Sequence, residues 1–181
     1  MPADTNRDYR NTTDCPALVD VASKKCILER RIQKDHKHAK IMYNLVHNKQ
    51  GIYFKDFSEI YNCKCAYCGA LLGISDIRLF EVDHFICLDA FPPNISGRSE
   101  AGKLSNLVLA CYSCNRGKGN LVIDGVYKET LNPDDGSIAQ VFERDKNYYI
   151  RIQPNYVQDQ FVINFYQKLL LGSEFRRLDY L

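Results

Sequence analysis

The sequence predicts an α+β fold with a small mixed core, a helical N-terminal region, and a C-terminal region made of a β-hairpin and a helix. Three observations support this prediction. Apolar residues recur at helical spacing in the first third of the chain, two Cys-x-x-Cys pairs bracket the middle third, and short β-rich segments precede another helical pattern near the end. We therefore expect three regions, comprising residues 1–62, 63–123 and 124–181.

The composition is that of an ordinary globular protein. The chain has 181 residues, of which 45% are hydrophobic and 25% charged. No apolar run approaches the ~18–20 residues needed to span a membrane. The polar N-terminal sequence lacks the apolar core of a secretory signal. We therefore expect a cytoplasmic protein that does not associate with membranes.

The N-terminal region is expected to be helical and locally basic. Residues 17–48 show helical periodicity, although the polar stretch 34–38 leaves open whether they form one helix or two, and a short helix is expected at 54–61. Within residues 24–49, only Glu29 and Asp35 oppose a larger set of basic side chains, which are Lys24, Lys25, Arg30, Arg31, Lys34, Lys37, Lys40 and Lys49. This excess fits contact with a polyanion such as DNA, and equally fits a solvated helix face.

The remaining elements are predicted from local patterns. Residues 78–86 have the β-branched and aromatic content of a strand, residues 88–105 are polar and read as a loop, and residues 106–120 begin as a strand and then become helical. After the turn signal at 130–137, two strands at 138–143 and 148–152 form a plausible hairpin. Residues 156–171 read as an amphipathic helix.

The cysteine spacing indicates a metal site. Because nothing suggests secretion, the eight cysteines favour metal binding over disulfides. The pairs Cys65–Cys68 and Cys111–Cys114 supply the four thiolates that close a tetrahedron around zinc at ~2.3 Å. Such a closed site leaves no open position, so this zinc would be structural. Cys63 could exchange roles with Cys65.

Asp83 and His84 lie on the expected strand between these pairs. A neutral imidazole can accept a proton from water near neutral pH, and a carboxylate is a hard oxygen ligand for Mg²⁺. Neighbouring strand residues point to opposite faces, so both can face one ion only where the strand twists or ends. Alone, this dipeptide would most often be an ordinary surface feature.

Other motifs accompany it in a fixed order. Cys-x-x-Cys-Gly at 65–69, Val-Asp-His at 82–84, Asn-Leu-Val-Leu-Ala-Cys at 106–111 and Cys-Asn-Arg-Gly-Lys-Gly at 114–119 together resemble the HNH, or ββα-metal, endonuclease family. The resemblance covers residues 60–122, about a third of the chain. It implies a ββα-metal core and metal-dependent hydrolysis of DNA phosphodiester bonds.

The resemblance also implies roles for individual residues. His84 matches the general base that activates water, and Asp83 matches its metal-binding neighbour. Asn106 matches the central Asn that braces the catalytic His. Asn115 matches the last motif position, where relatives place a His or an Asn as second metal ligand; an Asn ligates through oxygen, which favours Mg²⁺ or Mn²⁺.

Beyond the motif, Arg116 and Lys118 are expected to hold phosphate oxygens of the substrate, although a solvated surface position is an alternative for both. The resemblance suggests a restriction enzyme, a homing nuclease or an antiphage-defence effector, the last acting with a protein partner such as an ATPase. A nonenzymatic zinc module that binds nucleic acid and an RNA-cleaving HNH nuclease are the competing interpretations. A pure scaffold would need only the cysteines, which argues against the first of them.

Overall fold

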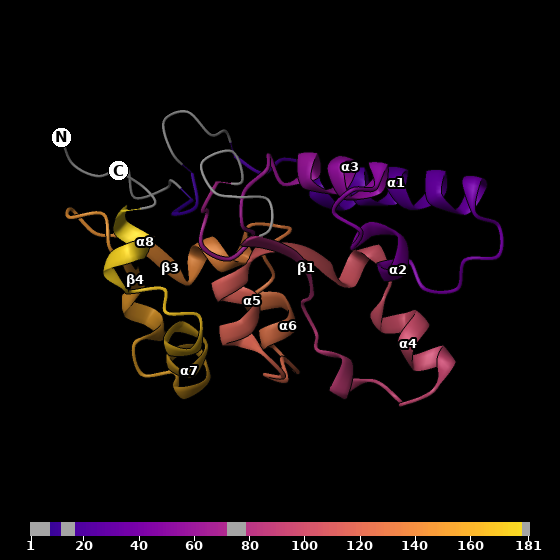
Figure 1. Ribbon diagram of the computed structural model, residues 1–181. Coiled ribbons are helices and arrows are strands. Elements are labelled where there is room, and N and C mark those ends of the chain that lie inside the picture. The colour runs from indigo at the N-terminus through magenta and orange to yellow at the C-terminus, as the bar shows by residue number, and fades with distance from the viewer. Residues whose placement is uncertain (1–7, 12–16, 72–78, 179–181) are drawn as a thin grey trace.

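The computed structural model describes residues 8–11, 17–71 and 79–178, and the helices of residues 21–60 lie on the other side of a central β pair from the elements that follow residue 142 (Figure 1). The N-terminal residues from which a cytoplasmic location is expected lie largely outside this description. The helices are α1 (Val21–Asp35), α2 (Tyr43–Val46), α3 (Ile52–Ile60), α4 (Ile95–Ala101), α5 (Tyr112–Lys118), α6 (Tyr127–Thr130), α7 (Gln160–Lys168) and α8 (Glu174–Leu178). The strands are β1 (Phe80–His84), β2 (Leu107–Cys111), β3 (Phe142–Arg144) and β4 (Ile150–Ile152).

The centre of the molecule is an antiparallel β pair followed directly by a helix. β1 pairs with β2 so that Phe80 lies opposite Cys111 and His84 opposite Leu107. Every residue of β2 is buried, because N-terminal helices and C-terminal elements cover the pair. Helix α5 starts at the residue after β2. The mixed α+β fold and the ββα core expected from the sequence are confirmed.

The expected N-terminal helical stretch is divided into α1 and α2, with a break after Asp35. Helix α1 buries Val21, Leu28 and Ile32, which lie on one face at helical spacing. The break falls in the polar stretch that left the number of helices open, because these residues offer no apolar side chains to continue the buried face.

One basic residue of α1 is part of the interior. Lys25 is 2% exposed, and its Nζ lies 2.5 Å from both the Leu107 carbonyl oxygen and Asp134 Oδ2. Arg31 pairs with Asp56 at 2.5 Å on the surface. The exposed basic side chains of residues 24–49 that remain include Lys34, Lys37 and Lys40.

Three sequence predictions need correction. Residues 88–105 are not only a loop, because they contain α4, whose N-terminus is capped by the Asn94 side chain accepting a hydrogen bond from the Gly97 amide. Near the C-terminus, residues 137–140 form a 3-10 turn where the first hairpin strand was expected to begin, which leaves three-residue strands. Helix α7 is shorter than predicted and starts after its capping residue Asp159.

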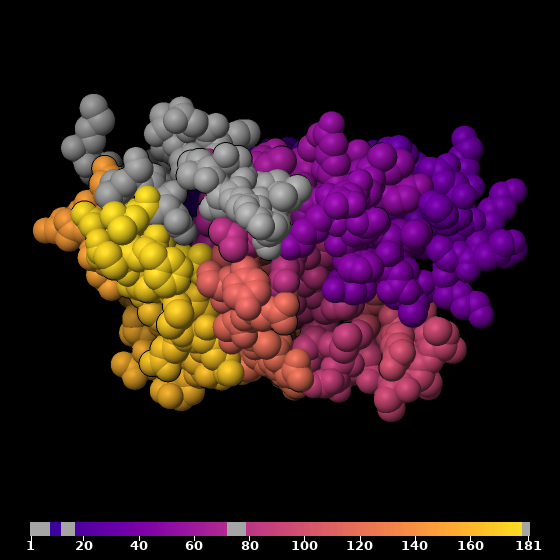
Figure 2. Space-filling view, in the orientation of Figure 1, coloured from indigo at the N-terminus to yellow at the C-terminus, as the bar shows by residue number. Residues whose placement is uncertain are grey.

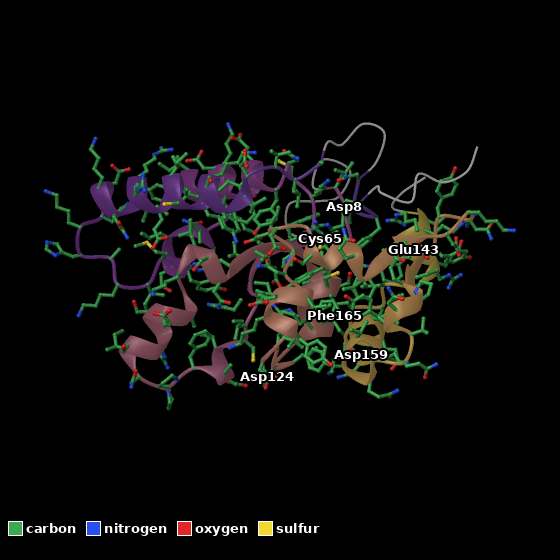
Figure 3. The ribbon with its side chains drawn as sticks, turned by 180° about the vertical axis from the view of Figure 1, so that it is seen from behind. Asp8, Cys65, Asp124, Glu143, Asp159 and Phe165 are labelled. Atoms are coloured by element: carbon green, nitrogen blue, oxygen red, sulfur yellow. The ribbon has the colours of Figure 1, made fainter. Side chains whose placement is uncertain are left out.

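The three regions share one hydrophobic core, and their surfaces adjoin one another in the space-filling view (Figure 2). Phe165 of α7 points inward (Figure 3), where its ring lies 6.0 Å from that of Tyr67 and 6.1 Å from that of Phe142. Helices α5 and α7 meet at Gly117, where an added Cβ would lie 2.1 Å from the Lys168 carbonyl oxygen. No described helix is long and apolar enough to cross a membrane.

Candidate active site and metal centre

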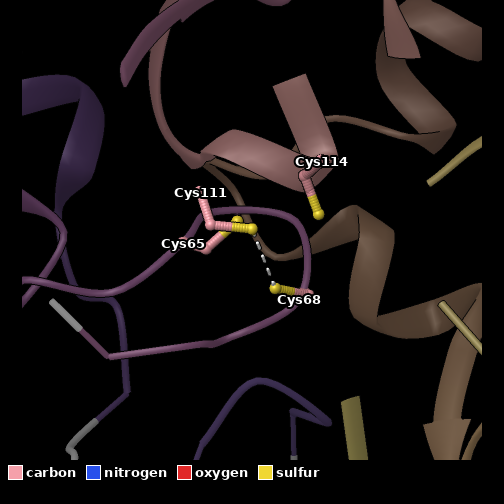
Figure 4. Close-up of side chains that lie close together, drawn as sticks. All are labelled: Cys65, Cys68, Cys111 and Cys114. Carbon is pink, nitrogen blue, oxygen red and sulfur yellow. Dashed lines mark hydrogen bonds between the residues drawn. The ribbon is translucent and has the colours of Figure 1, made fainter. Parts of the chain in front are cut away.

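The two Cys-x-x-Cys pairs form one buried cluster. Cys65 and Cys68 lie on a loop, Cys111 ends β2 and Cys114 lies on α5 (Figure 4). Their sulfur atoms lie within 4.8 Å of one another, and those of Cys68 and Cys111 are 3.8 Å apart. The structure gathers Cys65 into this cluster, whereas Cys63 is not a member of it.

The geometry of this cluster fits a tetrahedral metal ion. Bonds of ~2.3 Å place tetrahedral sulfur ligands about 3.8 Å apart, which matches the 3.8 Å between Cys68 Sγ and Cys111 Sγ. The turn that carries the first pair closes with a hydrogen bond from the Gly69 amide to the Cys65 carbonyl, and Gly69 has a φ of 81° that favours glycine. The four cysteines could therefore hold a metal such as zinc.

A second candidate site is a cleft of about 440 Å³ beside the β pair. Residues far apart in the sequence line it. Those expected from the sequence are Asp83, His84, Asn115, Arg116 and Lys118, and they are joined by Tyr43, His47, Lys49, Glu81 and Asn120. Asp83, His84 and Asn115 therefore converge on one cleft, whereas Asn106 is not among the residues that line it.

His84 ends β1 and is half-buried in the cleft. Its ring packs against Tyr43 at 4.5 Å between centroids, and Tyr43 stacks on His47 at 4.9 Å. Burial, with a contribution from the nearby Lys118 charge, lowers the pKa of His84 to about 4. The imidazole is therefore neutral near pH 7, which is the form that can accept a proton.

Asp83 lines the same cleft from a deeper position, which is possible because β1 ends at His84. The Tyr67 hydroxyl donates to Asp83 Oδ2 at 2.7 Å, and Lys118 Nζ lies 3.3 Å from the same oxygen. Burial raises the pKa of Asp83 to about 6, against the opposing influence of Lys118 and the Tyr67 hydrogen bond.

Lys118 is placed differently from the sequence expectation of a phosphate contact. Its side chain is fully buried, and Nζ donates to the His84 carbonyl oxygen at 2.9 Å while facing Asp83. This lysine thus connects the last turn of α5 to the end of β1. Its ammonium group is already engaged inside the protein and offers no exposed surface to a phosphate.

Asn106 makes the contacts that a bracing role requires. Its side-chain oxygen accepts from the Ile86 amide at 2.9 Å, and its Nδ2 donates to the Ile86 and Ala101 carbonyl oxygens at 3.0 and 2.8 Å. The Asn106 carbonyl oxygen also accepts from the Phe85 amide at 2.8 Å. These bonds fix the turn that directly follows His84.

Glu81 is a cleft residue that the sequence analysis missed. Asn115 Nδ2 donates to Glu81 Oε2 at 2.5 Å, and Arg116 Nη2 lies 3.0 Å from Glu81 Oε1. Because Nδ2 is held by Glu81, the Asn115 amide oxygen remains the atom available to a cation. The signal that could have identified Glu81 is its spacing, two residues before Asp83 on the same strand.

The cleft has the donors for an oxygen-ligated cation. Carboxylates and an amide oxygen suit Mg²⁺ or Mn²⁺. Within the described part of the chain, the four cysteines are the one group of three or more His, Cys, Asp or Glu side chains close enough to share an ion. A cation at Asp83 and Asn115 would therefore have few protein ligands, which leaves coordination positions for phosphate and water.

Comparisons with known proteins agree with this arrangement. A family described as HNH endonuclease matches residues 65–121. A stretch of 87 residues is 29% identical to the CRISPR-associated endonuclease Cas9 of Corynebacterium diphtheriae, and covers 48% of this chain but 7% of that protein. No solved structure gives a significant match. The matched family segment contains both the four cysteines and the expected catalytic residues.

Proposed function

We propose, because residues 65–121 match the HNH endonuclease family, that the protein is a metal-dependent endonuclease that hydrolyses DNA phosphodiester bonds. The carrying observation is the convergence of Asp83 and His84 of β1 and Asn115 of α5 on one cleft, although about 30 residues separate them in the sequence. The proposed core spans residues 63–123, the zinc ion at the four cysteines is structural, and residues 1–62 and 124–181 support the core and the substrate.

The proposed chemistry divides the work among the cleft residues. The neutral His84 imidazole takes a proton from a water molecule, whose oxygen attacks the phosphorus while the 3′ oxygen leaves. Asp83 and Asn115 would hold Mg²⁺ or Mn²⁺, which supplies positive charge to the phosphate and the leaving oxygen. Asn106 fixes the turn after the base, and the exposed Arg116 is positioned to contact a phosphate oxygen.

A setting in restriction or antiphage defence is proposed on narrower grounds. The Corynebacterium relative is described as a CRISPR-associated endonuclease, but the match covers a small part of it. In such a setting a protein partner, for example an ATPase, would supply target selection.

Cleavage of supercoiled plasmid tests this function. Purified protein with Mg²⁺ should nick or linearise the plasmid, and His84→Ala should reduce the rate by ~10²–10⁴-fold while leaving the mobility shift of bound DNA intact. His38→Ala, an exposed histidine beyond α1, is the matched control and should cut normally. Cleavage by His84→Ala at the parental rate would refute the assignment of His84 as the general base. If the parental protein cleaved no nucleic acid, a binding module would be favoured. If it cleaved RNA and not DNA, the substrate would be RNA.

A further inference from the structure

The four-cysteine cluster has a contact from far outside the HNH segment. Arg176 of α8 is 2% exposed, and its guanidinium group donates to three of the four cysteine sulfur atoms. Nη1 lies 3.1 Å from Cys68 Sγ and 3.2 Å from Cys111 Sγ, and Nη2 lies 3.0 Å from Cys114 Sγ. One fork of donors therefore covers one face of the sulfur tetrahedron.

The electrostatics of a filled site explain why an arginine belongs there. Four thiolates carry four negative charges and Zn²⁺ carries two positive ones, so the filled site keeps an excess of negative charge. Leaving such charge buried without a partner is strongly unfavourable. Arg176 offsets part of it, and its planar fork can reach several sulfur atoms at once.

Other contacts hold the guanidinium group in this orientation. Nη2 also donates to Ser113 Oγ at 2.8 Å and lies 3.3 Å from the Leu169 carbonyl oxygen, at the end of α7. Ser113 stands between the two cysteines of the second pair. The turn at Gly69, which follows the first cysteine pair, packs against the Arg10 backbone so closely that an added Cβ would lie 2.6 Å from the Arg10 carbonyl oxygen. Segments near both ends of the chain thus enclose the cysteines.

We propose that Arg176 is a positioning residue of the metal centre, which retains zinc by neutralising the zinc–thiolate charge and by hydrogen bonding to Cys68, Cys111 and Cys114. The inference rests on the proposed zinc occupancy and is independent of nuclease activity. It makes the C-terminal helix α8 a functional part of a site whose four ligands all lie in the HNH segment.

Release of zinc from the full chain to a chromogenic chelator tests this proposal. Loss of a partner that orients metal ligands typically costs ~10–100-fold in metal affinity, so Arg176→Gln should release zinc faster by about that factor. Arg176→Lys keeps the charge but not the fork, and should lie between the parent and Arg176→Gln. Arg177→Gln is the matched control, since Arg177 pairs with Glu174 at the surface of the same helix.

A spectroscopic measurement separates this role from general stabilisation of α8. In Co²⁺-substituted protein, the sulfur-to-metal charge-transfer bands should shift in Arg176→Gln and Arg176→Lys, because the hydrogen bonds withdraw electron density from the sulfur atoms. Arg177→Gln should keep the parental bands. Parental zinc release and unshifted bands in Arg176→Gln would overturn the proposal. If Arg176→Gln does not fold, the same two parental results in Arg176→Lys would overturn it.

Discussion

Replacement of Lys118 by Met distinguishes two roles for this lysine, a structural role in a buried ion pair with Asp83 and a direct contact with a substrate phosphate. The Lys118 side chain is fully buried, and its ammonium group lies 2.9 Å from the His84 carbonyl oxygen and 3.3 Å from Asp83 Oδ2. Removing one partner of a buried charge pair costs about 3–5 kcal/mol, because the remaining charge is left without compensation. At about 2–4 °C per kcal/mol for a chain of this size, the melting temperature should fall by roughly 6–20 °C.

This effect is measured by thermal unfolding of the zinc-containing protein without Mg²⁺ or Mn²⁺. Saturating Mg²⁺ should restore part of the lost stability, because a cation at Asp83 would replace the missing charge. Arg116→Met is the control, because its side chain is 62% exposed and its removal should leave the melting temperature near the parental value. The structural role would be refuted if Lys118→Met kept the parental melting temperature and if the slope of log binding constant against log salt concentration fell by ~0.9 in magnitude.

Two further predictions concern metals and the basic N-terminal region. Brief EDTA treatment should stop DNA cleavage while zinc stays bound and the protein stays folded. Added Mg²⁺ or Mn²⁺ should restore cleavage, and Ca²⁺ should support DNA binding with little cleavage. Full cleavage by EDTA-treated protein without added ion would contradict the mechanism. Changing the exposed Lys34, Lys37 and Lys40 to Glu should flatten the log–log salt dependence of DNA binding by up to about 2.7, at ~0.9 for each lost phosphate contact. An unchanged slope in binding titrations would identify these side chains as solvated surface.

Local sequence patterns were sufficient to predict the features that depend on residues close together in the chain. The spacing of Cys65, Cys68, Cys111 and Cys114 predicts the cluster, because two cysteines three residues apart can reach one metal ion. Residues 80–84 form a strand because alternate apolar residues, Phe80 and Val82, are buried against the core. Helix α4 was missed although Asn94 is a recognisable capping residue, because its polar composition resembles that of a loop.

Features that depend on distant partners were not predictable in the same way. Lys118 and Arg176 look like surface cations in sequence, but in the fold each is buried opposite hydrogen-bond acceptors, Asp83 and the His84 carbonyl for Lys118 and cysteine sulfur atoms for Arg176. Tyr43 carries no motif, yet the short helix α2 brings its ring against His84. Charge and periodicity describe one segment of the sequence at a time. The burial of these side chains depends on contacts between two segments that are distant in the sequence.

The three parts of the chain are coupled at the residues proposed for catalysis. Lys25 of α1 donates to the carbonyl oxygen of Leu107, the residue that lies opposite His84 in the β pair. Tyr43 packs against the His84 ring, and Arg176 binds the cysteines on both sides of the β2–α5 junction. The HNH segment supplies the ligands and the proposed base, while the flanking regions supply buried charges and packing that hold them. Residues outside the matched segment therefore contribute to both sites, with Tyr43 packing at the cleft and Arg176 donating hydrogen bonds to the cysteine cluster.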